Sequence, residues 1–107
     1  MELTDIHWVA GFLEGEGAFK LAKVGNKTYI RISAASTDED VIERLDGLTI
    51  HGTMHGPYQY KSNNLEYWTW EIAKQKHVAA LLMTIYPIMS ERRQNKISEL
   101  LTHWKAS

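Results

Sequence analysis

Cysteine is absent from this 107-residue chain, which excludes disulfides and cysteine-ligated metal sites and is compatible with a reducing compartment. No apolar run approaches the roughly 20 residues that a membrane-spanning helix needs. The first residues, Met-Glu-Leu-Thr-Asp, lack the basic segment with which a secretory signal begins. We therefore expect a soluble protein with no membrane partner, cytoplasmic in a prokaryote or phage, or else organellar.

A net positive charge is also missing. The formal net charge is -1 at pH 7, which on its own argues against a nucleic-acid partner. The distribution of the charges says more than their total. Residues 1–16 carry four acids and no Lys or Arg, residues 17–37 carry four bases and no acid, and residues 71–107 carry six bases against three acids. A neutral total can hide a basic face, and we expect one in residues 17–37.

The chain is expected to form one domain over residues 1–107, because its length suits a single core and 44% of its residues are hydrophobic. Apolar periodicity predicts helices over about residues 5–15, from about 37, over 76–85 and over 88–104. Thr4 or Asp5 is the expected N-cap of the first helix, and Thr37 with Asp40 approximates a capping box for the second.

Alternating apolar and polar residues predict two β-hairpins between these helices. The first pairs residues 18–24 with 27–34 around Gly25-Asn26, and the second pairs residues 53–60 with 65–72 around the loop 61–64. Gly56-Pro57 indicates a bulge or an edge strand. The order α-ββ-α-ββ-α-α predicts an α+β fold, in which the helices cover one side of an antiparallel sheet and leave a polar, basic groove on the other.

The most informative segment is Trp8–Phe19, an apolar helix that ends in two carboxylates among glycines. Val9-Ala10-Gly11-Phe12-Leu13-Glu14-Gly15-Glu16-Gly17 resembles the nine-residue LAGLIDADG motif of homing endonucleases and related maturases. The departures are Val for the first Leu, Phe-Leu for Leu-Ile, and Glu for both acids. The similarity extends to the αββαββα order, the helix start at 36–41, the Tyr-Trp-x-Trp strand at 67–70 and the Tyr-Pro-x-x-Ser-Glu-Arg-Arg run at 86–93.

This resemblance implies a homodimer that cuts both strands of a long, roughly palindromic DNA duplex. Since the chain holds one motif, the second motif helix comes from a second chain. The interface residues implied are Trp8, Ala10, Gly11, Phe12, Glu14 and Gly15. The two copies of Glu16 would then bind Mg²⁺, with two or three ions per dimer, together with the Gly15 carbonyl; Mn²⁺ or Ca²⁺ would substitute in binding, and no organic cofactor is implied.

The same resemblance makes Glu16 and Arg92 the expected catalytic residues. Glu14 is expected to be structural, because residues i and i+2 of a helix point in different directions. The expected DNA-binding residues are outward strand positions together with Arg93: Lys20, Ala22, Tyr29, Arg31, Ser33, His55, Gln59, Tyr67, Thr69 and Arg93.

Two other functions stay open at this point. A relative that binds DNA or RNA without cutting it, such as a maturase or a decayed nuclease, is favoured by Ala34-Ala35, which stand where the family often has a polar residue. A purely structural dimerising domain is opposed by the basic, acid-free segment 17–37. The target sequence is not readable from the chain, because specificity also depends on DNA shape.

Overall fold

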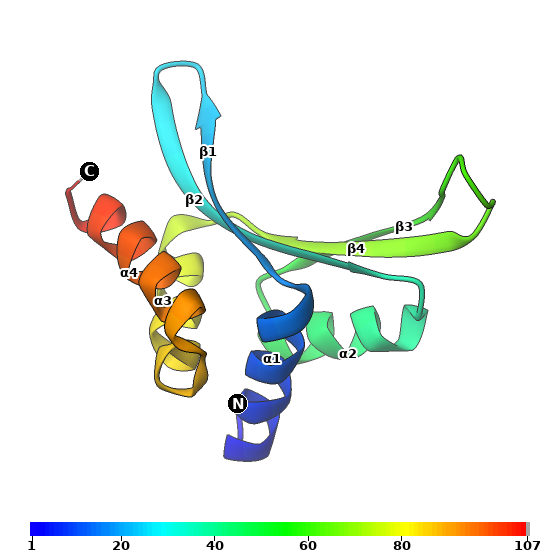
Figure 1. Ribbon diagram of the computed structural model, residues 1–107, viewed down its shortest axis with the longest axis horizontal. Coiled ribbons are helices and arrows are strands. Elements are labelled where there is room, and N and C mark those ends of the chain that lie inside the picture. Colours follow the sequence, from blue (N-terminus) through cyan, green and yellow to red (C-terminus); the bar gives the residue numbers. More distant parts are fainter. Residues whose placement is uncertain (107) are drawn as a thin grey trace.

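The computed structural model describes residues 1–106 and has the predicted order of elements (Figure 1). The elements are α1 (Leu3–Glu16), β1 (Ala18–Val24), β2 (Lys27–Ser36), α2 (Glu39–Thr49), β3 (Thr53–Gln59), β4 (Glu66–Ile72), α3 (Gln75–Ile85), the 3-10 turn η1 (Tyr86–Ile88) and α4 (Glu91–Ala106). Within residues 1–106, no helix has the length and apolar character to cross a membrane. The α+β fold class is thus confirmed.

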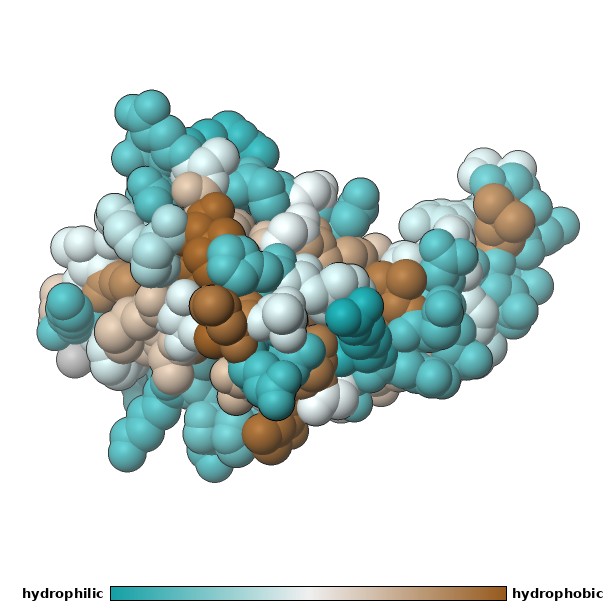
Figure 2. Space-filling view, turned by 90° about the horizontal axis from the view of Figure 1, so that it is seen from below, coloured by the Kyte–Doolittle hydropathy of each residue, from teal (hydrophilic) through white to brown (hydrophobic). Residues whose placement is uncertain are grey.

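The four strands form one antiparallel sheet in the order β1-β2-β4-β3, so that β1 and β3 are its edges. Figure 1 shows all four helices on one side of this sheet, while the two hairpins rise at its ends and leave the other face curved and uncovered. In Figure 2, which looks at the helix side, apolar patches lie among hydrophilic residues and the β3–β4 hairpin extends beyond the helices. We call the uncovered face of the sheet, opposite the helices, the open face.

One core lies between the sheet and the helices. The alternation predicted for β2 is confirmed, because Ile30, Ile32 and Ala34 are buried while Arg31 between them is exposed. The helices close this core with apolar faces that include Val9, Ala10 and Leu13 of α1, Ile42 and Leu45 of α2, Val78, Leu82 and Ile85 of α3, and Ile97 and Leu100 of α4. Gly52 lets the chain pass against the buried Trp70, since a Cβ there would lie 2.0 Å from the indole Nε1.

The predicted hairpins are confirmed to within two residues, but the predicted helix caps are wrong. Helix α1 begins at Leu3, so Thr4 and Asp5 lie inside it, and its N-cap Glu2 makes no side-chain hydrogen bond to the helix. Asp38, not Thr37, is the N-cap of α2, and its backbone N–H donates to Ser36 Oγ (3.0 Å). Buried apolar faces position both helices, so a local capping signal does not decide where they start.

Candidate functional site

The uncovered face of the sheet collects most of the strand residues that sequence alternation placed there. Residues directly opposite one another in an antiparallel sheet share a face. The register pairs Lys20 with Arg31, Ala22 with Tyr29, Ser33 with Glu71, and His55 with Thr69. These residues therefore form one surface that crosses all four strands.

Gln59 is an exception, and its predicted position is wrong. The register shifts between His55 and Tyr58, so that Tyr58 pairs with Tyr67 on the open face while Gln59 pairs with Glu66 on the other face. One extra residue in the Gly56-Pro57 bulge causes this shift, because a single inserted residue moves every later residue of the strand to the opposite face. Tyr58 thus takes the place on the open face that strict alternation had given to Gln59.

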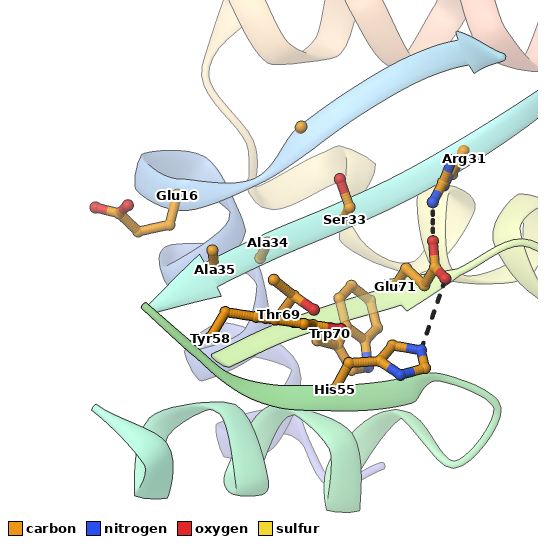
Figure 3. A pocket seen from close by; sticks show the side chains of 11 residues that line it. Glu16, Arg31, Ser33, Ala34, Ala35, His55, Tyr58, Thr69, Trp70 and Glu71 are labelled. Atoms are coloured by element: carbon orange, nitrogen blue, oxygen red, sulfur yellow. Dashed lines mark hydrogen bonds and ion pairs between the residues drawn. The ribbon is translucent and has the colours of Figure 1, made fainter. Parts of the chain in front are cut away.

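A cavity of about 650 Å³ opens at the centre of this face (Figure 3). Its walls come from the end of α1, the start of β1, and strands β2, β3 and β4: Glu16, Ala18, Arg31, Ser33, Ala34, Ala35, His55, Tyr58, Thr69, Trp70 and Glu71. Figure 3 shows Glu16 at the rim, with its carboxylate directed away from the strand residues. The carboxylate that ends the motif helix is therefore exposed beside the open face.

A network of three polar side chains spans three strands inside this cavity. The Arg31 guanidinium on β2 donates a hydrogen bond to the Glu71 carboxylate on β4, and His55 Nε2 on β3 lies 3.9 Å from the second carboxylate oxygen. Figure 3 shows Glu71 between the two basic side chains. Sequence alternation places Glu71 outward, but only the strand order brings an acid against Arg31.

Glu14 is not among the residues that line the cavity, and its side chain connects α1 to the start of α4. Its carboxylate accepts hydrogen bonds from the backbone N–H (2.7 Å) and the hydroxyl (2.8 Å) of Ser90, the residue before α4. The Ser90 backbone N–H bond is the main cause that lowers the pKa of Glu14 below 4.5, and Arg93 adds to it. These contacts hold the Glu14 carboxylate within its own chain, whereas the resemblance had also placed Glu14 in a dimer interface.

Arg93, which sequence reasoning placed among the DNA-binding residues, is mostly turned inward. Its guanidinium donates to the Glu14 carbonyl from Nε (3.2 Å) and Nη2 (3.0 Å), and only 13% of the side chain is exposed. It also lies over the Phe19 ring, 5.0 Å from the centroid. A cation at the carboxyl end of a helix satisfies the terminal carbonyl groups, so Arg93 has a structural contact that sequence reasoning missed.

Arg92 lies outside the central cavity. It is exposed and lines a neighbouring cavity of about 450 Å³ together with Lys20 and Lys96. Ala18 lines both cavities, so the start of β1 connects the Glu16 side to this cationic side. The structure thus places Glu16 and Arg92 in adjacent hollows and gives no direct contact between them.

The outward face of α1 carries two glycines, Gly11 and Gly15, beside partly exposed aromatic side chains. A Cβ added at Gly11 or Gly15 would meet no atom within 4 Å, so both glycines face open space. Trp8 and Phe12 stack beside them, with ring centroids 5.6 Å apart, and are only partly buried. Ala10 is only 1% exposed and packs into the core, so its predicted place in a dimer interface is wrong. It lies about 100° from Gly11 around the helix, on the inward side.

Comparison with family models and with curated proteins found no match. Comparison with solved structures found homing endonucleases with bound DNA. The chain matches I-CvuI in complex with the I-CreI target at a TM-score of 0.74 and 12% identity, and I-CeuI complexed with DNA at 0.75 and 13%. It matches the LAGLIDADG meganuclease I-AabMI, bound to uncleaved DNA, at 0.72 and 18%.

The chain has the LAGLIDADG fold. The matches cover 97%, 97% and 94% of this chain, but only 69%, 55% and 36% of I-CvuI, I-CeuI and I-AabMI. In this LAGLIDADG fold the motif residues 9–17 run from the middle of α1 to Gly17, where the chain enters β1. A Cβ on Gly17 would lie 2.6 Å from the Leu13 carbonyl oxygen, so the last glycine of the motif is required by the tight turn itself.

Proposed function

We propose that the protein is a sequence-specific DNA endonuclease that acts as a homodimer. The observation that carries this proposal is the exposed Glu16 carboxylate at the end of the motif helix, at the rim of the open sheet face. The uncovered, curved face suits an extended duplex, and Lys20 and Lys27 on the open face of the β1–β2 hairpin supply charges for its phosphates. The DNA complexes formed by proteins of the same fold support this assignment.

The dimer would form through the outward face of α1. Gly11 and Gly15 lie one turn apart and leave room for a second helix to approach closely, while Trp8 and Phe12 offer apolar surface beside them. Two identical helices that cross at this ridge would place both Glu16 carboxylates at the same end of the interface, because a two-fold axis repeats each residue.

The residues at the end of α1 fit a divalent cation with oxygen ligands. Of the last carbonyl groups of α1, that of Leu13 accepts from the Gly17 N–H and that of Glu14 accepts from Arg93. Neither contact uses the Gly15 carbonyl, which lies next to the exposed Glu16 in the chain. No cluster of three or more His, Cys, Asp or Glu side chains lies within residues 1–106, so one chain alone offers an incomplete ligand set. Glu16 and the Gly15 carbonyl of two chains would hold Mg²⁺, which supplies charge stabilisation at phosphate oxygens and activation of water.

The chain's own residues would position the DNA for hydrolysis. Arg92 and Lys20, in the hollow next to Glu16, would bind the phosphates that flank the scissile bond. Since arginine stays protonated in proteins, Arg92 would stabilise negative charge and would not act as a base. The clamp of Glu14, Ser90 and Arg93 would hold the end of α1 still, and with it Glu16.

Cleavage is tested on a duplex selected for binding from a random library. The unaltered chain should cut both strands when Mg²⁺ is added, and Glu16→Gln should bind the same duplex without cutting it. Glu43→Gln, an exposed acid on α2, is the matched control and should cut normally. Cleavage by Glu16→Gln at the unaltered rate would contradict the assignment of Glu16.

The dimer is tested with Gly11→Leu. Since a side chain at Gly11 meets no atom of its own chain, this variant should fold normally but sediment as a monomer. Gly47→Leu on α2, where a Cβ also meets open space, should remain dimeric. An unaltered chain that sediments as a monomer at all concentrations and with DNA would overturn the homodimer.

A second candidate is a relative that binds nucleic acid without cutting it. Ala34 and Ala35 favour it: both line the cavity, but the Ala34 side chain is buried in the core, and the Ala35 methyl group on the open face cannot position water or a phosphate. Binding of the selected duplex by the unaltered chain, without cleavage in Mg²⁺ or Mn²⁺, would decide for this second function.

A further inference from the structure

Glu71 is an acid at the centre of a surface that we assign to a polyanion. Its carboxylate is hydrogen-bonded to Arg31 on one neighbouring strand and faces His55 on the other, while 32% of the side chain remains exposed. A solvated acid elsewhere on the surface needs no explanation. An acid here repels every phosphate that approaches the middle of the sheet.

The same carboxylate has a clear effect on the surrounding charges. Lys20 lies directly opposite Arg31 in the β1–β2 register, and two like charges in such a pair destabilise a sheet. Glu71, diagonal to Arg31 across β2 and β4, compensates one of these two charges. Lys20 is left to attract phosphate, whereas Arg31 is held beside a negative group that a phosphate oxygen would have to approach.

The hydrogen bond to Glu71 uses Nη2 of Arg31 and leaves other N–H donors of the guanidinium unused. The Arg31 side chain is 44% exposed and lines the central cavity, so these donors are accessible from the open face. A guanine edge in the major groove offers two neutral acceptors, O6 and N7, that match two guanidinium donors. An uncharged acceptor pair is not repelled by Glu71, whereas a phosphate is.

We propose that Glu71 is a specificity-determining residue, which fixes Arg31 to read one guanine base and keeps it from binding the phosphate backbone. This inference rests on the proposed DNA binding. His55 on the third strand lies on the other side of the carboxylate, with its Nε2 3.9 Å from the second oxygen of Glu71. One base pair in each half of the target is therefore read by an arginine that a carboxylate orients.

The experiment selects bound duplexes from a random library with the full chain and three variants. Arg31 in its oriented state should prefer guanine at one position by roughly 5- to 150-fold, the range of a good bidentate contact. Glu71→Gln should reduce that preference to about threefold or less, and Arg31→Lys should lose preference at the same position because an ammonium group has no planar fork. Glu66→Gln, on the same strand but the opposite face, is the matched control and should keep the preference.

Salt dependence gives a second, independent readout. Without the Glu71 charge, Arg31 is free to pair with phosphate, so Glu71→Gln should bind a duplex of arbitrary sequence more tightly. The slope of the logarithm of its binding constant against the logarithm of the salt concentration should steepen by about 0.9. Glu66→Gln should leave the slope within about 0.3 of the unaltered value.

The possible results separate the role of Glu71 from DNA binding itself. A guanine preference that survives in Glu71→Gln, with an unchanged salt slope, overturns the role of Glu71 while DNA binding stands. If far-UV circular dichroism shows that Glu71→Gln is unfolded, Glu71→Thr takes its place, because threonine suits a strand and carries no charge: loss of the guanine preference supports the inference, and its retention overturns it. Failure of the unaltered chain to bind any duplex at low salt overturns both this inference and the proposed function.

Discussion

Replacing Glu14 by alanine should loosen the connection between the motif helix and α4. The variant removes two hydrogen bonds from Ser90, at 2.7 and 2.8 Å, and the ion pair with Arg93, whose Nε lies 3.8 Å from the carboxylate. It leaves Arg93 bound to the Glu14 main-chain carbonyl, because that contact does not involve the side chain. The change therefore isolates the carboxylate.

The expected cost follows from the number and exposure of these contacts. A buried hydrogen bond to a charged group contributes about 1.5 to 3 kcal/mol. Since 34% of the Glu14 side chain is exposed, solvent screening reduces each of its two bonds to about 1 kcal/mol, and the ion pair adds about 0.5 kcal/mol. Glu14→Ala should thus lower the free energy of unfolding by about 2.5 kcal/mol, and Glu14→Gln, which keeps one acceptor oxygen, by about 1 kcal/mol.

Urea denaturation followed by tryptophan fluorescence measures both values. Glu99→Gln is the matched control, because Glu99 forms only an exposed pair with Lys96 at 3.3 Å and should cost less than about 0.5 kcal/mol. A cost for Glu14→Ala as small as that of the control would refute the structural role of Glu14.

The same clamp predicts a pH dependence of known sign. Because Ser90 lowers the pKa of Glu14 in the folded chain, the carboxylate stabilises the fold above pH 4.5, and this stability is lost as the pH falls through the lowered pKa. The difference in unfolding free energy between the unaltered chain and Glu14→Gln should therefore shrink below pH 4.5. A difference that stays constant down to acid unfolding would contradict this assignment.

Three further predictions use other parts of the chain. Gly52→Ala should destabilise the fold by about 2 kcal/mol, because its Cβ would overlap the Trp70 indole, whereas Gly47→Ala in open space on α2 should stabilise it by about 0.5 kcal/mol; equal urea midpoints would contradict this. The His77 and His51 rings stack with their centroids 3.4 Å apart, and desolvation, followed by the nearby His51, Lys74 and Lys76, lowers the pKa of His77. The unfolding free energy should therefore decrease as the pH falls below 6.5, and His77→Gln should flatten that decrease in thermal melts. Lys20→Gln and Lys27→Gln should each reduce the salt slope of DNA binding by about 0.9, and an unchanged slope would remove these lysines from the phosphate contacts.

Local chemistry in the sequence predicts the order of the elements and the buried face of a regular strand. In β2 the alternation of residues 28–34 gives the correct buried face, because a strand's side chains point to opposite sides in turn. The motif places Glu16 at the end of a helix and Gly17 at the turn, and Gly17 is required there because a Cβ would overlap the Leu13 carbonyl. These features depend on neighbours within a few residues along the chain.

What lies far apart in the sequence is decided by the tertiary structure. Arg93 is 79 residues from Glu14, and only the packing of α4 beside α1 turns it from an exposed base into the partner of a helix-end carbonyl. Gln59 and Tyr58 exchange faces because one bulge shifts the register, and periodicity cannot locate the residue at which the shift occurs.

Glu71 shows the same limit at the centre of the site. Sequence alternation places it outward, but strand order β2-β4-β3 sets it between Arg31 and His55. The sequence by itself determined the elements, the motif and the exposed Glu16, since these follow from short-range periodicity and turn chemistry. The tertiary structure alone decided which charges meet, because pairing across strands depends on register and order, which no local pattern encodes.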